Sequence, residues 1–309
     1  QRSLVGSEMG IRDRRPFVLG ACFALIGAFL SSTPPFQNAM AMDANRCGIP
    51  VVYGFCRGVG SVSYAAAVLL LGFVLERHAP TLLLPVFAAL TACGLIAMAG
   101  FRLPERPDEA ADRPAEHRSI AAVLRSHPRF ALTLLGCMFF FLTHTISNTY
   151  MNALVGKAGG TASAVGTSLA ISAVLELPAM TLVSRLQKRF SPGFFLRFAA
   201  GAEVVKFLIF YLARSMPFIY LGQCMQFFQF AVYAPATVYY VAAALPERDQ
   251  LKGQSLIYVA GSGLGGALGN LLGGRLLDRS GIQAALLLGT VSAAASLLTF
   301  CLSTREDSR

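Results

Sequence analysis

Residues 170–180, AISAVLELPAM, place a single carboxylate, Glu176, in a stretch that is otherwise typical of an apolar helix. Whether an acid is tolerated there depends on whether water or lipid surrounds the stretch. The composition of the chain indicates which of the two it is. Of its 309 residues, 55% are hydrophobic and 14% are charged, whereas soluble domains are typically about 45–50% apolar and about 25% charged. This balance indicates a membrane protein, in which lipid replaces water around the helices.

Apolar runs long enough to cross a bilayer, about 20 residues each, recur along the whole chain. We predict nine spans, at residues 17–42, 59–75, 82–100, 131–152, 163–184, 194–213, 217–244, 255–277 and 282–303. Several are interrupted by Gly, Pro or a single charge, as in polytopic bundles. The sequence therefore predicts an all-α, multi-pass integral protein of the cell (inner or plasma) membrane.

The net charge of +10 is explained by membrane orientation. The basic residues lie mainly in short loops between predicted spans, without an aromatic surface on which bases could stack, so we expect no nucleic-acid partner. Placing the longest loop, 101–130, in the cytoplasm leaves most Lys and Arg inside, as the positive-inside rule requires. The exceptions in the opposite loops are Arg77, Lys157, Arg214, Arg275 and Arg279. The arginines at positions 2, 12, 14 and 15 also fall on the wrong side.

A charged, Pro-rich stretch at 101–130 is predicted to be a cytoplasmic linker, with a short surface helix near 118–126. The predicted parts are a non-membrane segment 1–16, a partial helical bundle 17–100, the linker 101–130, a six-helix bundle 131–303 and a cytoplasmic tail 304–309. At one constant offset, Pro34 recurs as Pro235, Gly60 as Gly261 and Ser61 as Ser262. A repeat across a central linker indicates two half-bundles related by an axis along the membrane normal.

Four segments carry a family resemblance: YGFCRGVGSVSY (53–64), LELPAM (175–180), QFAVYAPATVYYV (229–241) and KGQSLIYVAGSGLGGALGNLLGGRLLDRSG (252–281). On these, the chain resembles the major facilitator superfamily, in the branch of the lactose permease and related oligosaccharide or nucleoside proton symporters. The resemblance covers most of the chain and implies a two-bundle fold in which the spans are helices four to twelve. Three would belong to the N-terminal bundle and six to the C-terminal bundle. We therefore expect a fragment or a truncated reading frame, which would not transport by itself.

Charged residues at the depth of the predicted spans are Asp43, Arg57, Glu176, Glu203 and Lys206. A charge at mid-membrane costs about 2.5–3.5 kcal/mol on insertion scales, so such residues usually face a cavity or one another. The resemblance implies that Glu176 is the acid that contacts a sugar and influences proton coupling, and that Arg57 holds substrate hydroxyls. It places Lys206 where the permease has an arginine beside its proton site. Structural ion pairs and snorkelling head groups are the alternatives.

Glu203 and Lys206 lie three residues apart, one helical turn, so they can pair within their own helix. The alternative is that Lys206 exchanges partners between Glu203 and Glu176 as the cleft opens. The candidates for proton coupling are therefore Glu176 first, then Glu203, Lys206 and Asp43.

The sequence departs from the permease at Gln226 and Gln229, which occupy the positions of a His and a Glu. Because Gln cannot titrate, the proton site does not carry over, and a facilitator without ion coupling stays an alternative. On one helical face, the two amides could hydrogen-bond a hydroxylated or heterocyclic ligand. The same site would include Asn38, Asn148 and Tyr239, for which interhelical hydrogen bonding is the alternative.

We therefore predict a secondary active transporter that moves a small polar solute by alternating access, with sugar or oligosaccharide favoured over nucleoside and a proton as possible co-substrate. We expect a monomer, no cofactor and no metal, because the seven cysteines form no CxxC pair and His144 has no second ligand nearby. An intramembrane enzyme would need a nucleophile or metal constellation, and we find none. A non-transporting sensor or an inactive truncated remnant is the remaining alternative.

The glycines Gly265, Gly269 and Gly273 follow the small-xxx-small spacing that lets two membrane helices approach closely. We predict that they are packing residues.

Overall fold

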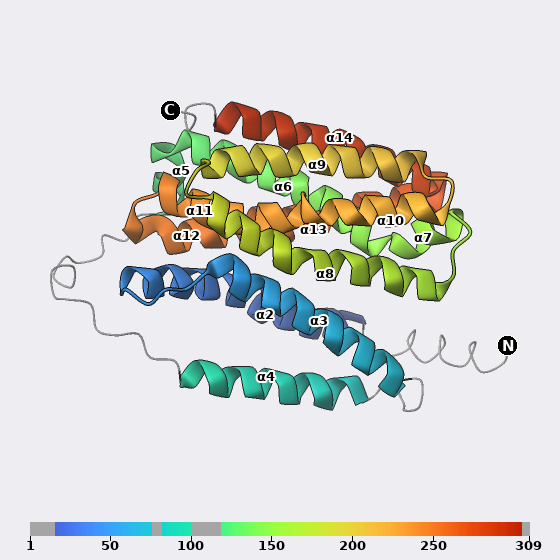
Figure 1. The fold of residues 1–309 in the computed structure, drawn as a ribbon, viewed down its shortest axis with the longest axis horizontal. Helices are drawn as coiled ribbons and strands as arrows, with labels where there is room; N and C mark the ends of the chain where they lie inside the picture. Colours follow the sequence, from blue (N-terminus) through green and yellow to red (C-terminus); the bar gives the residue numbers. More distant parts are fainter. Residues whose placement is uncertain (1–15, 76–81, 101–118, 305–309) are drawn as a thin grey trace.

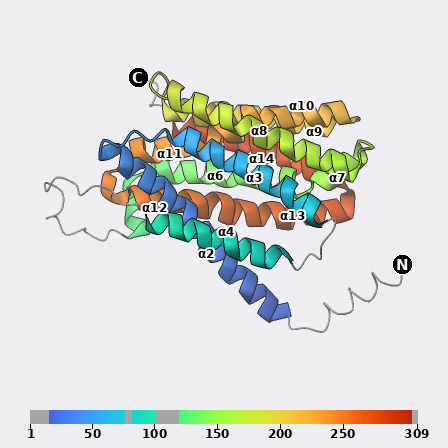
Figure 2. The ribbon, with the colours of Figure 1, turned by 60° about the horizontal axis from the view of Figure 1, so that its bottom comes forward.

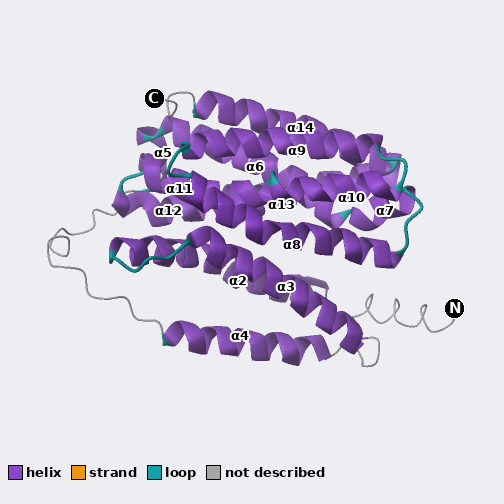
Figure 3. Cartoon of the chain, viewed as in Figure 1, coloured by secondary structure: helices purple, strands orange, loops and turns teal. Residues whose placement is uncertain are grey.

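The computed structural model describes residues 16–75, 82–100 and 119–304, and these are almost entirely helical, with no strand among them (Figures 1 and 3). The elements are α2 (Pro16–Arg46), α3 (Tyr53–Leu75), α4 (Leu83–Ala99), α5 (Ile120–Ser126), α6 (Pro128–Thr149), α7 (Met151–Lys157), α8 (Ala162–Leu186), α9 (Pro192–Leu212), α10 (Met216–Cys224), η2 (Met225–Phe227), α11 (Phe230–Ala244), α12 (Glu247–Tyr258), η3 (Val259–Gly265), α13 (Gly266–Ser280) and α14 (Ile282–Ser303). The predicted all-α class is confirmed.

In the part of the chain that the structure describes, five helical rods are long and apolar enough to cross a membrane. They are Pro128–Thr149, Ala164–Leu186, Met216–Ala244, Glu247–Ser280 and Ile282–Ser303. Each of the other predicted spans also falls on a helix, but α4 is shorter and α9 carries three charged residues. The number of nine crossings therefore stays a prediction.

The predicted domain boundaries also stay predictions, because several of them fall on residues that are not described. The predicted segment 1–16 apart from Pro16, the linker up to residue 118 and the tail after Thr304 lie outside the described residues. Within the linker, α5 falls inside the short helix expected near 118–126.

The helices from α6 to α14 form one bundle, with α2 and α3 against one side of it (Figure 1). Two of its rods are interrupted. A 3₁₀ turn, η2, separates α10 from α11, and a glycine-rich π-helical turn, η3, separates α12 from α13. Such interruptions release backbone groups from regular pairing and redirect side chains, and they are frequent at functional sites.

Helix α3 lies along α8, and α2 contacts α12, so the N-terminal helices meet the bundle along two lines (Figures 1 and 2). The α3–α8 approach is close because Gly58 has no side chain, and a Cβ there would lie 2.6 Å from Leu177 Cα. By contrast, α4 lies at the margin of the molecule, with Leu95 and Ile96 63% and 73% exposed. An apolar helix of this kind suits a lipid environment.

Within the bundle, η3 and α13 pack on α6 through the three glycines predicted for packing, Gly265 in η3 and Gly269 and Gly273 in α13. A Cβ on Gly269 would lie 2.6 Å from the carbonyl oxygen of Leu142, and one on Gly273 would lie 2.6 Å from the Tyr150 ring. The small-xxx-small prediction is therefore confirmed.

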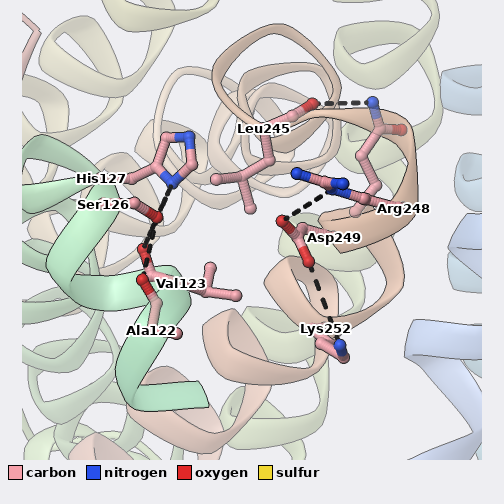
Figure 4. Close-up of polar contacts among 9 residues, drawn as sticks. Ala122, Val123, Ser126, His127, Leu245, Arg248, Asp249 and Lys252 are labelled. Carbon is pink, nitrogen blue, oxygen red and sulfur yellow. Dashed lines mark hydrogen bonds and ion pairs between the residues drawn. The ribbon is translucent and has the colours of Figure 1, made fainter. Parts of the chain in front are cut away.

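One end of the bundle holds two polar corners, shown in Figure 4. At the α5–α6 corner, the His127 Nδ1 atom lies 3.0 Å from Ser126 Oγ and 3.2 Å from the Val123 carbonyl oxygen. At the start of α12, the buried Asp249 carboxylate lies 4.0 Å from both Arg248 Nε and Lys252 Nζ. These contacts stabilise the turns at which α6 and α12 begin.

Candidate substrate and coupling site

A cavity of about 620 Å³ lies between α2 and α3 on one side and α6, α11, α12 and η3 on the other. Its lining includes the polar residues Gln37, Asn38, Arg57, Thr237 and Ser262 and the aromatic residues Tyr53, Phe141, Phe230, Tyr233 and Tyr258. This volume falls within the range of about 300–1,000 Å³ that is usual for small-molecule sites. The mixture of a guanidinium, amides, hydroxyls and ring faces suits a polar solute that also has apolar faces.

The α2–α3 wall of this cavity is held by hydrogen bonds. The Tyr53 hydroxyl donates to Asn38 Oδ1 at 2.7 Å, and Asn38 Nδ2 donates to Gln254 Oε1 of α12 at 3.4 Å. Tyr53 also meets the ring of Tyr239 edge to face, with centroids 6.2 Å apart. Asn38 therefore both lines the cavity and connects the N-terminal helices to the bundle.

The far wall is aromatic. The Phe140 and Tyr233 rings stack with centroids 3.9 Å apart, and the His144 ring stacks on Phe230 at 4.3 Å. These contacts hold Tyr233 and Phe230 in place as ring surfaces of the cavity, because neither ring can turn without losing its stacking partner.

A polar chain of five residues, Arg57–Ser61–Glu176–Gln226–Lys206, leads from the cavity into the bundle. Arg57 Nη1 donates to Ser61 Oγ at 3.3 Å, and the Ser61 hydroxyl donates to Glu176 Oε2. Gln226 Nε2 donates to Glu176 Oε1 at 3.0 Å, and Lys206 Nζ donates to Gln226 Oε1 at 2.9 Å. The chain connects α3, α8, η2 and α9. It answers why Glu176 is tolerated in an apolar helix, since both of its carboxylate oxygens are hydrogen-bonded in a buried position.

An amide suits the position between the two charges. The Gln226 carbonyl oxygen faces the ammonium of Lys206 and its NH₂ group faces the carboxylate of Glu176, so one side chain meets an opposite partner at each end. Neither His nor Glu could offer a donor and an acceptor in this way without depending on its protonation state.

Glu203 is fully buried one turn before Lys206, and among the described residues neither of its carboxylate oxygens has a hydrogen-bond partner. The charges of Glu203 and Glu176 both act on the Lys206 ammonium, which is itself hydrogen-bonded to Gln226. Lys206 is thus linked to Glu176 through Gln226, while the exchange of partners with Glu203 stays a prediction.

Gln226 and Gln229 do not lie on one continuous α-helix, which was the basis on which a shared face was predicted. Gln226 lies in the 3₁₀ turn η2, and Gln229 follows that turn with φ −98° and ψ −94°, so no continuous α-helix joins them. Gln229 is buried, and its side-chain amide has no hydrogen-bond partner among the described residues. Only Gln226 belongs to the polar chain.

Three other predicted residues do not line the 620 Å³ cavity. Asn148 is exposed on α6, with Nδ2 3.0 Å from His144 Nε2. The hydroxyls of Tyr239 and Ser184 are hydrogen-bonded at 3.0 Å, which makes Tyr239 part of the contact around α8. Asp43 lines a separate cavity of about 250 Å³.

Sequence reasoning missed Ser61 as a site residue. It lies four residues after Arg57, and residues at this spacing share a helix face. A hydroxyl one turn from an arginine in a predicted apolar helix could therefore have been identified from the sequence. Tyr53 and Tyr258 were missed because their role depends on which helices meet. In the described ranges, no group of His, Cys, Asp and Glu is arranged to hold a metal ion.

A family profile described as "MFS_1 like family" matches residues 13–288. The chain belongs to this family. It is 28% identical over 286 residues to a maltose permease of Geobacillus stearothermophilus, which covers 92% of this chain and 71% of the relative. It is 23% identical over 309 residues to an uncharacterized transporter, YwbF, of Bacillus subtilis (strain 168), covering 99% of this chain and 75% of the relative. The chain is thus a multi-pass membrane protein of the major facilitator type, built for transport of a small solute.

Proposed function

We propose that this protein is a secondary transporter that binds a hydroxylated solute in the 620 Å³ cavity and couples its movement to a proton at Glu176. Sugar or oligosaccharide is the first candidate and nucleoside the second. The observation that carries the proposal is the polar chain, which joins a cavity-lining arginine to a buried carboxylate. The likeness to a maltose permease supports the sugar class.

Solute binding rests on Arg57, Asn38 and the tyrosine rings of the cavity. A guanidinium offers a planar fork of donors, which fits two neighbouring hydroxyls. The Asn38 amide adds a donor and an acceptor on the same side. The rings of Tyr53 and Tyr258 offer apolar faces on which the C–H face of a sugar can rest.

Proton coupling rests on the hydrogen bonds of Glu176. An ionised carboxylate only accepts, and here it accepts one bond from Ser61 and one from Gln226. A proton on Oε2 would turn that oxygen into a donor, and the Ser61 hydroxyl would then accept from both Glu176 and Arg57. Protonation would thus change the hydrogen bonds of Ser61 and, through Ser61, those of the Arg57 guanidinium that lines the cavity, so protonation and solute binding would be linked.

Lys206, inside the bundle, is the residue that would respond to protonation of Glu176. Neutralising Glu176 removes part of the attraction that holds the ammonium near Gln226. Glu203, whose oxygens have no hydrogen-bond partner among the described residues, is then the remaining anionic partner one turn away. Lys206 would thus exchange its carboxylate partner from Glu176, which it reaches through Gln226, to Glu203.

The test is uptake of labelled disaccharides and nucleosides into vesicles that contain the protein expressed from its complete coding sequence, with and without an imposed pH gradient. Wild type is expected to accumulate a disaccharide when the gradient is present. Glu176→Gln is expected to lose accumulation but to keep equilibration, since the cavity is intact. Glu247→Gln serves as the matched control, because Glu247 is exposed at the start of α12 and does not line the 620 Å³ cavity.

Each alternative predicts its own result. Equal uptake by wild type and Glu176→Gln, independent of pH, would indicate a facilitator and contradict proton coupling. Accumulation of nucleosides alone would contradict the sugar class. Absence of any uptake by folded protein would favour the non-transporting sensor or remnant.

A further inference from the structure

A second groove lies where the start of α3 meets the end of α8. Its volume is about 390 Å³. It is lined by Val52, Phe55, Thr181, Ser184, Arg185 and Lys188. The groove therefore has one wall from the N-terminal helices and one from the C-terminal bundle, and none of its lining residues lines the 620 Å³ cavity.

One wall of this groove is cationic. Arg185 and Lys188 are both exposed, lie one turn apart at the end of α8, and have no ion-pair partner among the described residues. Helix α8 ends at Leu186, and the predicted span ends at 184. These two cations thus come directly after the apolar stretch, at the depth where phospholipid phosphates lie.

The other wall is apolar. Val52 and Phe55 are 48% and 50% exposed at the start of α3. Between them, the Gly54 N–H donates to Ser184 Oγ at 2.9 Å, which fixes the α3 backbone against α8 and keeps the groove in shape. Two unpaired cations beside an exposed aromatic ring fit an amphipathic anion better than a freely soluble one.

We propose that this groove binds an anionic phospholipid, with its phosphate between Arg185 and Lys188 and the upper part of an acyl chain along Phe55 and Val52. Basic pockets between transmembrane helices are known sites for anionic headgroups. Because the lipid would contact α3 and α8 together, it would stabilise the contact between these two helices. The inference does not depend on which solute the protein carries.

The test is lipid binding to the purified full chain in neutral detergent, followed by native mass spectrometry during titration with phosphatidylglycerol or phosphatidylcholine. Wild type is expected to retain phosphatidylglycerol preferentially. Removal of both cations in R185Q/K188Q is expected to weaken this binding roughly 30-fold, because each of the two cations usually contributes about fivefold to binding near an anionic lipid surface. Phe55→Ala is expected to weaken it about tenfold through the lost apolar contact.

The matched control is K157Q/R214Q, which removes two exposed cations, one at the end of α7 and one after α9, and is expected to leave binding unchanged. Equal weakening by the two double variants would overturn the proposal, since it would indicate non-specific attraction. Equal retention of both lipids by wild type would also overturn it. So would displacement of the lipid by millimolar inorganic phosphate, which would identify a free phosphate as the ligand. All variants must elute as monodisperse protein in size-exclusion chromatography.

Discussion

Two helix contacts in this molecule are built with glycine, α3 on α8 and α13 on α6, and they differ in the chemistry that accompanies them. In both, a Cβ on the central glycine, Gly58 or Gly269, would lie 2.6 Å from backbone of the facing helix. The α6–α13 contact lies inside one bundle, and its side-chain hydrogen bonds lie at an exposed end, at Asn270. The α3–α8 contact joins two parts of the chain and includes the buried carboxylate of Glu176. Glycine thus permits close packing at both contacts. Of the two, the α3–α8 contact is the one that includes a buried carboxylate, whose charge can change.

The largest difference is expected between Gly269→Val and Gly58→Val. Gly269→Val would force α13 away from α6 within the bundle, and we expect a loss of about 4 kcal/mol or more, so that little folded protein is recovered. Gly58→Val would act between two parts that have further contacts of their own. We expect folded protein that has lost gradient-driven uptake by more than tenfold. Size-exclusion chromatography in detergent and vesicle uptake measure the two effects.

Gly201→Ala is the control for this pair, since nothing lies within 4 Å of a Cβ at that position. It should behave as wild type in both measurements. If Gly58→Val and Gly269→Val unfold the protein equally, the distinction between a contact inside one bundle and a contact between two parts is wrong.

A smaller effect is expected from Gln226→Leu, which removes the bridge between Lys206 and Glu176. Two buried charged groups would each lose a hydrogen-bond partner, and we expect a loss of about 3 kcal/mol in the free energy of unfolding. Gln229→Leu should be neutral or stabilising, because it removes a buried amide that has no partner among the described residues. Thermal unfolding of the purified variants measures both. The reverse order of stability would contradict the polar chain as described.

The smallest effect is expected from Tyr53→Phe at the α2–α3 wall. The variant keeps the ring and loses the hydrogen bond to Asn38 Oδ1, so we expect a loss of about 1 kcal/mol. Tyr211→Phe, at a half-exposed tyrosine of α9, should leave the unfolding temperature unchanged. An unchanged temperature for Tyr53→Phe would show that the hydroxyl contributes nothing to this wall.

Much of the fold could be predicted because membrane insertion imposes simple rules. Apolar length and a scarcity of charge predicted helices at every proposed span, and glycine spacing predicted the α6–α13 contact. The cost of a charge in lipid singled out Arg57, Glu176 and Lys206, which the structure joins in one polar chain.

The differences between the predicted site and the structure have two causes, which are an interrupted helix and helix neighbours that the sequence does not reveal. Gln226 and Gln229 were assigned to one face because an unbroken α-helix was assumed, and the turn at η2 separates them. Asn148 and Tyr239 were assigned to the cleft by helix alone, although their rotational positions turn them elsewhere. Position on a helix decides which side chains meet only when that helix is continuous and its neighbours are known.

The amino-acid sequence by itself determined that this is a helical membrane protein, which stretches form its apolar helices, and which few charged residues in them need partners, because those questions depend on local transfer energies. Only the tertiary structure decided which residues those partners are. That Ser61 and Gln226 are the two donors to Glu176 depends on the close approach of α3 to α8 and on the break between α10 and α11. Neither is a property of any one segment, since both arise only when separate helices pack together.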